Sequence, residues 1–198
     1  MTARLKFEEK PEYKRGLAGE STIALWLRRS GYTVLPAYEK IVDNGKGPRV
    51  FLPESILVAP DFLSWRGQKV GWIEAKHKTA FTWHRLTHRW TTGIDLSHYK
   101  DYLKVADLSP WPVWLLFLHD GDQAKDSPPN SPRGLFGNDL NYLRHHENHR
   151  SDKWGPSGMV YWAVGDLQLL SRDVFESCGA ERKRIEPEVG SAEWFEAE

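Results

Sequence analysis

Residues 55–76 read SILVAPDFLSWRGQKVGWIEAK, and this stretch decides how the chain folds. It consists of two largely apolar runs that are separated by a polar turn at residues 66–69. Apolar runs that are joined by a short turn containing glycine are typical of a β-hairpin. We therefore expect two neighbouring strands here, with Asp61 on the first and Glu74 at the end of the second apolar run.

The hairpin carries two carboxylates and an ammonium. Because side chains alternate along a strand, Glu74 and Lys76 point to the same face, and Ala75 points to the other. Twelve residues lie between Asp61 and Glu74, which suits the return of a hairpin. The alternative is that these charged residues merely decorate two strands, as such triplets do by chance in many proteins.

These residue types suit the hydrolysis of a phosphodiester bond. The reaction needs a nucleophilic water and neutralisation of charge on the phosphate, and a bound divalent metal can serve both needs. Mg²⁺ prefers oxygen ligands, so the carboxylates of Asp61 and Glu74 and the main-chain carbonyl of Ala75 form a suitable set. Lys76 could orient or deprotonate the water, or offset charge on the phosphate, and the sequence does not choose between these roles.

Glu20 is a further candidate, on a helix predicted at residues 17–30. At about 100° per residue, it shares a narrow stripe with three apolar side chains. A carboxylate on such a face is unfavourable unless it is paired or bound to a cation. Glu20 either pairs with an arginine such as Arg15 or Arg28, or points across the sheet towards the two carboxylates of the hairpin.

The rest of the chain alternates helical and strand-like patterns. After the first helix we expect, in order, a strand at 32–37, the hairpin, a helix from the N-cap Asp95 to about Asp107, strands at 113–118 and 159–164, and a short helix at 167–177. Residues 39–50 read as an exposed loop or an open hairpin tip. This order predicts an α/β fold, with a mixed central β-sheet flanked by helices.

The 198 residues suffice for one well-buried core. We expect a single domain at residues 1–179, with an insertion at 121–157 that is rich in turn-forming residues, followed by a charged, flexible tail at 180–198. Cys178 is the only cysteine, which excludes an intramolecular disulfide and a cysteine-based zinc finger.

The formal net charge is zero, which argues against a nonspecific binder of polyanions. The N-terminal residues contain no apolar stretch of the kind that secretory signals have. The longest strongly apolar run, residues 113–118, is far shorter than the roughly 20 residues that span a bilayer. We therefore expect a cytoplasmic protein without membrane contact.

Taken together, Gly19-Glu20, Pro60-Asp61 and Glu74-Ala75-Lys76 resemble the motifs of the PD-(D/E)XK nuclease superfamily. Its members include Holliday junction resolvases, RecB-type exonucleases and many restriction enzymes. The resemblance spans residues 16 to about 118, and it follows the order of a restriction-endonuclease-like core, which is helix, three strands, helix and strand.

The resemblance implies roles for five residues. Asp61, Glu74 and Lys76 would be catalytic. The same two carboxylates and the carbonyl of Ala75 would bind Mg²⁺ or Mn²⁺, with Glu20 as an auxiliary ligand.

The helix that follows Asp95 carries His98-x-x-x-Tyr102. This spacing is similar to the Gln-x-x-x-Tyr element of the RecB-type branch, with His in place of Gln, and it implies that His98 and Tyr102 contact nucleic acid. On the alternative interpretation, Tyr102 belongs to the core face of the helix.

The segment between Ala75 and Ile94 contains no acidic residue and interleaves basic with aromatic side chains. Surfaces of this kind track a nucleic-acid backbone and stack on bases. We expect nucleic-acid contacts from four residues, which are Lys78, Trp83, Arg85 and Arg89. The alternative is a solvated basic loop whose tryptophans belong to the core.

The sequence thus predicts a Mg²⁺- or Mn²⁺-dependent nuclease that hydrolyses DNA phosphodiester bonds. A catalytically inactive nucleic-acid-binding module on the same fold is the first alternative. The second is an interaction protein that uses Trp194-Phe195 in the acidic tail as a docking peptide. The sequence does not decide the oligomeric state, and a homodimer is one of the states that it allows.

Overall fold

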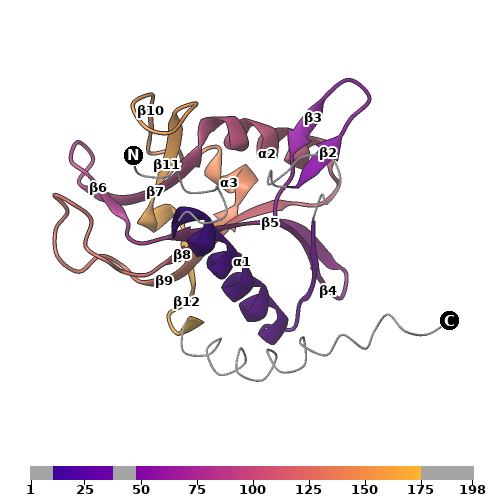
Figure 1. Ribbon diagram of the computed structural model, residues 1–198, viewed down its shortest axis with the longest axis horizontal. Coiled ribbons are helices and arrows are strands. Elements are labelled where there is room, and N and C mark those ends of the chain that lie inside the picture. Colours follow the sequence, from indigo (N-terminus) through magenta and orange to yellow (C-terminus); the bar gives the residue numbers. More distant parts are fainter. Residues whose placement is uncertain (1–10, 38–47, 175–198) are drawn as a thin grey trace, which may run out of the picture.

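The computed structural model describes residues 11–37 and 48–174. Helix α1 (Pro11–Arg29) lies across one face of a six-stranded sheet, whose strand order is β1-β4-β5-β8-β9-β12 (Figure 1). The strands are β1 (Thr33–Pro36), β4 (Phe62–Arg66), β5 (Lys69–Lys78), β8 (Val113–His119), β9 (Gly134–Asp139) and β12 (Gln168–Ser171). Strands β5 and β8 run parallel, and the other neighbours are antiparallel. The predicted α/β fold with a mixed central sheet is therefore confirmed.

Strand β8 divides the core into two clusters. Leu116 and Leu118 pack with α1, whereas Leu115 and Phe117 pack on the opposite face with α2 (Leu96–Leu108). This alternation explains why the predicted strand at 113–118 is apolar on both faces. Asp95 caps α2 as predicted, because its side chain accepts a hydrogen bond from the backbone N–H of Ser97.

Two smaller sheets complete the described part of the chain. One has the order β10-β11-β7-β6, and the other pairs β2 with β3. Their strands are β2 (Arg49–Phe51), β3 (Ile56–Val58), β6 (Thr82–His84), β7 (Arg89–Asp95), β10 (His149–Ser151) and β11 (Met159–Ala163). A short helix α3 (Leu140–Leu143) and a 3₁₀ turn η2 (Val164–Asp166) lie between strands.

The core elements α1, β1, β4, β5, α2 and β8 follow the expected order of helix, three strands, helix and strand. Two hairpins, β2–β3 and β6–β7, are inserted into this order and pair outside the central sheet. The first apolar run of the expected hairpin is therefore split, because residues 56–58 pair with β2 and only residues 62–66 pair with β5. None of the helices in the described residues is long and apolar enough to cross a membrane.

Two predictions about the second half of the chain differ from the structure. The helix expected at 167–177 is wrong, because residues 168–171 form β12 and pair with β9. The expected insertion at 121–157 contributes β9 to the central sheet and β10 to the second sheet. The segment at 180–198 that we expect to be a flexible tail lies outside the described residues, and most of the expected loop at 39–50 does so as well.

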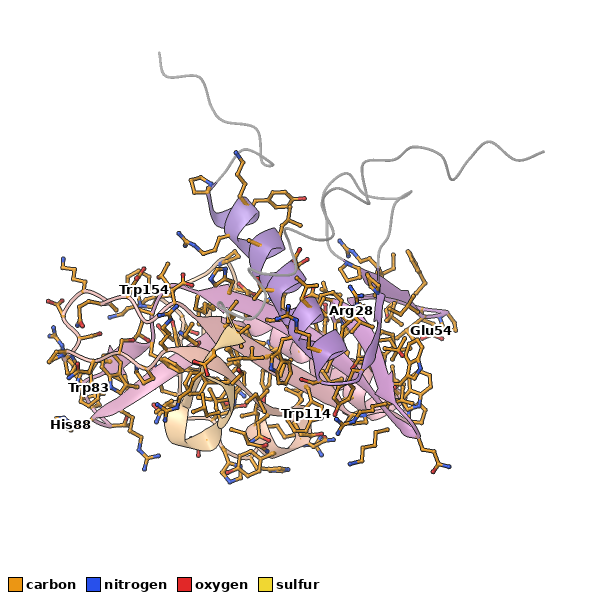
Figure 2. All side chains as sticks on the ribbon, turned by 90° about the horizontal axis from the view of Figure 1, so that it is seen from below. Arg28, Glu54, Trp83, His88, Trp114 and Trp154 are labelled. Atoms are coloured by element: carbon orange, nitrogen blue, oxygen red, sulfur yellow. The ribbon has the colours of Figure 1, made fainter. Side chains whose placement is uncertain are left out.

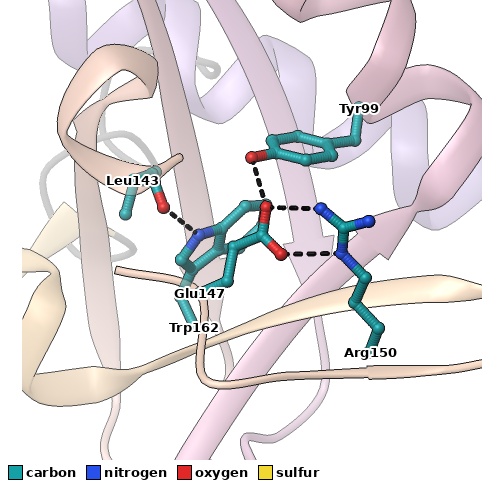
Figure 3. Close-up of polar contacts among 5 residues, drawn as sticks. All are labelled: Tyr99, Leu143, Glu147, Arg150 and Trp162. Atoms are coloured by element: carbon teal, nitrogen blue, oxygen red, sulfur yellow. Dashed lines mark hydrogen bonds and ion pairs between the residues drawn. The ribbon is translucent and has the colours of Figure 1, made fainter. Parts of the chain in front are cut away.

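A polar network fastens α2 to the segment before β11 (Figure 3). The hydroxyl of Tyr99 donates to Oε1 of Glu147 at 2.7 Å, and Arg150 donates to both oxygens of the same carboxylate at 2.7 and 2.8 Å. Nearby, Nε1 of Trp162 donates to the carbonyl of Leu143 at 2.9 Å. Each of these polar side chains thus has a partner, which holds α2 in a fixed position beside the sheet.

Candidate active site

The register of the β4–β5 hairpin brings its two acidic residues together. Phe62 pairs with Ile73, and Asp61 directly precedes β4, so this antiparallel register continued by one residue places Asp61 opposite Glu74. Directly opposite side chains share a face, and their Cβ atoms are about 4.5–5.5 Å apart. Asp61 is fixed further by its Oδ2 atom, which accepts a hydrogen bond of 2.8 Å from the backbone N–H of Ala75.

Glu74 is a buried carboxylate in an unusual setting. Its side chain is 1% exposed, and the ammonium of Lys76 contacts its Oε1 atom as an ion pair. Within the described residues, neither carboxylate oxygen of Glu74 receives a hydrogen bond of normal geometry. Buried polar atoms normally have such partners, and those that lack them require an explanation, such as an ion or a catalytic role.

The charges of the four candidate residues act on one another. Burial and then the charge of Glu74 raise the pKa of Asp61 to about 7, against the opposing effect of Lys76. Burial and then the charge of Asp61 raise the pKa of Glu20 to about 7, again against Lys76. Burial would lower the pKa of Lys76, but the charges of Glu74 and Asp61 outweigh it and raise that pKa above its ordinary value. The three carboxylates and the ammonium therefore share one electrostatic environment.

Helix α1 reaches this site because it approaches β5 very closely. A Cβ atom on Gly19 would lie only 2.3 Å from Cβ of His77, so only glycine allows this approach. His77 also bridges two elements, with Nδ1 3.1 Å from the carbonyl of Arg15 on α1 and Nε2 2.7 Å from Oδ1 of Asp120 after β8. The sequence does not reveal that His77 connects α1 to the end of β8, because the three residues are far apart in the chain.

Glu20 follows Gly19 and is thereby held beside the hairpin. In the described part of the chain, it forms no ion pair with Arg15 or Arg28, the two arginines that the sequence offers as partners. Its electrostatic neighbours are Asp61 and Lys76. The structure thus favours the second interpretation, in which Glu20 points towards the hairpin.

Helix α2 packs on the face of the sheet that lies opposite α1, and this is the face to which Glu74 points. Tyr102 is 1% exposed, and burial and then the charges of Glu74 and Asp61 raise the pKa of its hydroxyl. Burial and then the charge of Lys76 lower the pKa of His98. Tyr102 is therefore a core residue and a neighbour of the carboxylates at once, and its contact with nucleic acid stays a prediction.

Lys78 continues the row of side chains formed by Glu74 and Lys76 along β5, because residues at i, i+2 and i+4 share a face. Burial and then the charge of Lys76 lower the pKa of Lys78 to about 8. Lys78 is half-buried, and the sequence indicates a basic residue near the site but not this partial burial, which depends on the packing of neighbouring elements.

The other predicted contact residues lie on the β6–β7 hairpin, at one end of the molecule (Figures 1 and 2). Trp83 packs edge-on against Trp90 with ring centroids 5.4 Å apart, and it is half-buried. Arg85 is exposed and forms an ion pair of 3.4 Å with Asp126, and Arg89 is exposed as well. The structure does not bring these residues into the cluster of carboxylates.

The residues of the site fit a hard divalent cation in chemical type. Asp61, Glu74 and Glu20 offer carboxylate oxygens, Ala75 offers a main-chain carbonyl, and such oxygens are the ligands of Mg²⁺. Since the described residues give the oxygens of Glu74 no hydrogen bond of normal geometry, these oxygens suit a ligand position. No group of three or more His, Cys, Asp or Glu residues in the described ranges is already arranged to hold a metal ion. In this arrangement, the ammonium of Lys76 occupies the position against Glu74.

Comparisons with protein-family models and with curated proteins found no match. Among solved structures, the chain is similar to Hjc, a Holliday junction resolvase from the archaeal hyperthermophile Archaeoglobus fulgidus. The TM-score is 0.44 and the sequence identity is 9%, over 76% of this chain and 90% of that chain. The likeness concerns the course of the backbone, and no role of any residue follows from it.

Proposed function

We propose that this protein is a metal-dependent nuclease that hydrolyses DNA phosphodiester bonds. One observation carries the proposal: the buried carboxylate of Glu74 lies beside Asp61 and Lys76, and its oxygens receive no hydrogen bond of normal geometry from the residues that the structure describes. Concentrating like charges in a buried place is unfavourable for folding. Sites with strongly perturbed pKa values of this kind are frequently functional.

The carboxylates of Asp61 and Glu74 and the carbonyl of Ala75 would hold Mg²⁺ or Mn²⁺, with Glu20 as an auxiliary ligand. When bound, the ion supplies an activated water and offsets the charge that develops on the phosphate. The hydrogen bond from the N–H of Ala75 keeps the carboxylate of Asp61 in place for this role.

Lys76 provides a positive charge next to the reacting phosphate. Its ammonium has three N–H donors and therefore can hydrogen-bond to a phosphate oxygen and orient a water at the same time. When a cation binds Glu74, the ammonium of Lys76 would leave this carboxylate and become available to the substrate. The ion pair between Lys76 and Glu74 would thus hold the ammonium at the site until the cation binds.

Contacts with the rest of the DNA would come from basic and aromatic side chains beyond the carboxylates. Lys78 follows Lys76 on the same face of β5 and suits a neighbouring phosphate. Arg85 and Arg89 on the β6–β7 hairpin suit more distant phosphates, and Trp83 beside them suits stacking on a base. Such contacts make binding weaker as the salt concentration rises.

The test is a cleavage assay on purified protein with labelled single-stranded, duplex, flap and four-way DNA, and with matched RNA. Each substrate is incubated with Mg²⁺, with Mn²⁺ or with EDTA. We expect cleavage of at least one DNA with metal and none with EDTA. Absence of cleavage with every substrate and metal would contradict the proposal. Tight binding of DNA without cleavage would instead identify an inactive binding module.

A further inference from the structure

A second feature, on the α1 face of the central sheet, is a pocket of about 540 Å³. It lies between the end of α1 and strands β4, β5, β8 and β12, and its largely apolar lining includes three aromatic residues, Trp26, Tyr32 and Trp114. The proposed catalytic site is elsewhere, because Ile73 lines the pocket from the α1 face whereas Glu74 points to the other face.

The surroundings of this pocket are basic. Among the described residues that line it, Lys69 alone is charged, and it is exposed. The guanidinium of Arg66 lies 4.7 Å from the centre of the Tyr32 ring, which itself lines the pocket. Arg28 and Arg29 are exposed in the last turn of α1, directly after two residues of the lining (Figure 2 labels Arg28). An acidic segment that carries aromatic side chains matches this pocket in both charge and chemistry.

The chain itself contains such a segment. Residues 186–198 read EPEVGSAEWFEAE, with five glutamates, no basic residue, and the adjacent pair Trp194-Phe195. The segment therefore carries a purely negative charge together with two adjacent aromatic side chains. Large aromatic side chains flanked by charge are effective anchors for an apolar pocket with a charged rim.

The segment is also attached at the right place. Leu170 on β12 lines the pocket, and Val174, the last described residue, is fully buried in the core cluster beneath it. Twenty residues lead from Val174 to Trp194. A flexible chain of this length has a typical end-to-end distance of about 25 Å, which is enough to return to the pocket. The tether also raises the local concentration of the segment to the millimolar range, roughly.

We propose that Trp194 and Phe195 dock into this pocket of their own chain, with Glu193 and Glu196 against its basic rim. The docked segment covers apolar surface of the α1 face and does not contact Glu74, which points to the opposite face of the sheet. This interaction goes beyond the proposed nuclease function and stands independently of it.

The test is photo-crosslinking within the full chain. Phe195 is replaced by p-benzoylphenylalanine, the protein is irradiated at a concentration at which light scattering shows a monomer, and crosslinked peptides are identified by mass spectrometry. We expect crosslinks within one chain to residues 26–32, 69–73 or 112–116. The same probe at Trp154, which is 67% exposed on the β10–β11 loop, serves as the control and should not label those residues.

The charge of the rim is tested with Lys69→Glu, which should lower the yield of these crosslinks several-fold. Lys104→Glu, at an exposed position on α2, is the matched control and should leave the yield unchanged. Thermal melts show whether both variants fold as the parent does. Crosslinks between two chains would mean that the pocket receives the tail of a second copy, and crosslinks that are scattered or absent would mean that it receives no tail. Either result would overturn the proposal.

Discussion

Glu74 is the residue in which folding and function conflict most clearly. Its charge is balanced by Lys76, but its oxygens receive no hydrogen bond of normal geometry within residues 11–37 and 48–174, and the carboxylate of Asp61 lies beside it. A neutral or apolar residue at this position would serve folding as well or better, because burying a charge without full compensation is unfavourable. We infer that the position is kept acidic for binding a cation.

Replacing Glu74 by glutamine tests this inference directly. The change keeps the shape but removes the charge, so cleavage should fall by at least about 100-fold because the proposed metal ligand is removed. Stability should change little, because Lys76 keeps Asp61 as an electrostatic partner and the repulsion between the two carboxylates disappears. Initial rates and thermal melts measure both effects. Glu54→Gln, at an exposed position, is the control, and a Glu74→Gln variant that cleaves at the normal rate would contradict the assignment.

His119 predicts a pH dependence of stability. It is 0% exposed and stacks on Phe81, with ring centroids 3.6 Å apart. Burial, followed by the charges of Lys78 and His77, lowers its pKa to about 3 from the ordinary value of 6.5. Between these values the unfolded chain binds one proton more than the folded chain. The stability that His119 contributes to the folded protein is therefore fully present above pH 6.5. As the pH falls from 6.5 towards 3, the free energy of unfolding declines by up to about 1.4 kcal/mol per pH unit.

Urea unfolding at several pH values measures this slope. His119→Gln should make the free energy of unfolding less dependent on pH between about 6.5 and 4, where the histidine takes up its proton on unfolding. His145→Gln, at an exposed position, should leave the slope unchanged. Equal slopes in the parent and in the His119 variant would show that this histidine is not held neutral by the fold.

At the scale of elements, the close packing of α1 on β5 determines where Glu20 lies. Gly19→Ala would place a Cβ atom 2.3 Å from Cβ of His77, so helix and strand must separate. We expect the free energy of unfolding to fall by about 1–3 kcal/mol, as in other overpacked cores. Cleavage should fall as well, because the shift moves Glu20 away from Asp61.

Gly16 offers a matched control on the same helix. A Cβ atom there would meet no described atom within 4 Å, so Gly16→Ala should raise the free energy of unfolding by about 0.5–1 kcal/mol through helix propensity. Chemical denaturation and cleavage rates distinguish the two variants. If both substitutions had the same effect, the close approach at Gly19 would not be what positions the helix.

The elements that can be predicted from sequence are those determined by local pattern. The β4–β5 turn, the cap at Asp95 and the doubly apolar strand β8 are visible in consecutive residues, and the structure confirms them. The helix predicted in place of β12 is wrong because the partner strand β9 lies far earlier in the chain, where Gly137 pairs with Gln168. Pairing over such a distance leaves no signal in a local window, so tertiary structure overrides the local pattern.

In the candidate site, too, local sequence pattern predicts some features, and long-range packing determines the others. Asp61, Glu74 and Lys76 can be predicted as neighbours, because a single hairpin and the alternation of side chains fix their relation. Glu20 can be proposed from its place on an apolar helical face. The partial burial of Lys78 and the hydrogen bond between His77 and Asp120 cannot be predicted, because each depends on how elements distant in sequence pack together.

At the scale of the whole molecule, the β6–β7 hairpin lies apart from the carboxylates, so binding and chemistry should be separable. Arg85→Ala and Arg89→Ala should each weaken DNA binding. In each variant, the logarithm of the DNA-binding constant should also depend less steeply on the logarithm of the salt concentration. The slope should change by about 0.9 for each phosphate that the arginine neutralises. The rate at saturating DNA should stay near that of the parent. Titrations at several salt concentrations measure the first effects, and a fall in the saturated rate without a change in affinity would refute this division.

The central claim is that Asp61, Glu74 and the carbonyl of Ala75 form a site for a divalent cation, with Glu20 beside it. A crystal of the protein soaked in Mn²⁺ and measured at an anomalous wavelength tests it most directly. We predict an anomalous peak in contact with both carboxylates, with the ammonium of Lys76 released from Glu74. Saturating Mn²⁺ with no peak there, and with Lys76 still paired to Glu74, would contradict the claim.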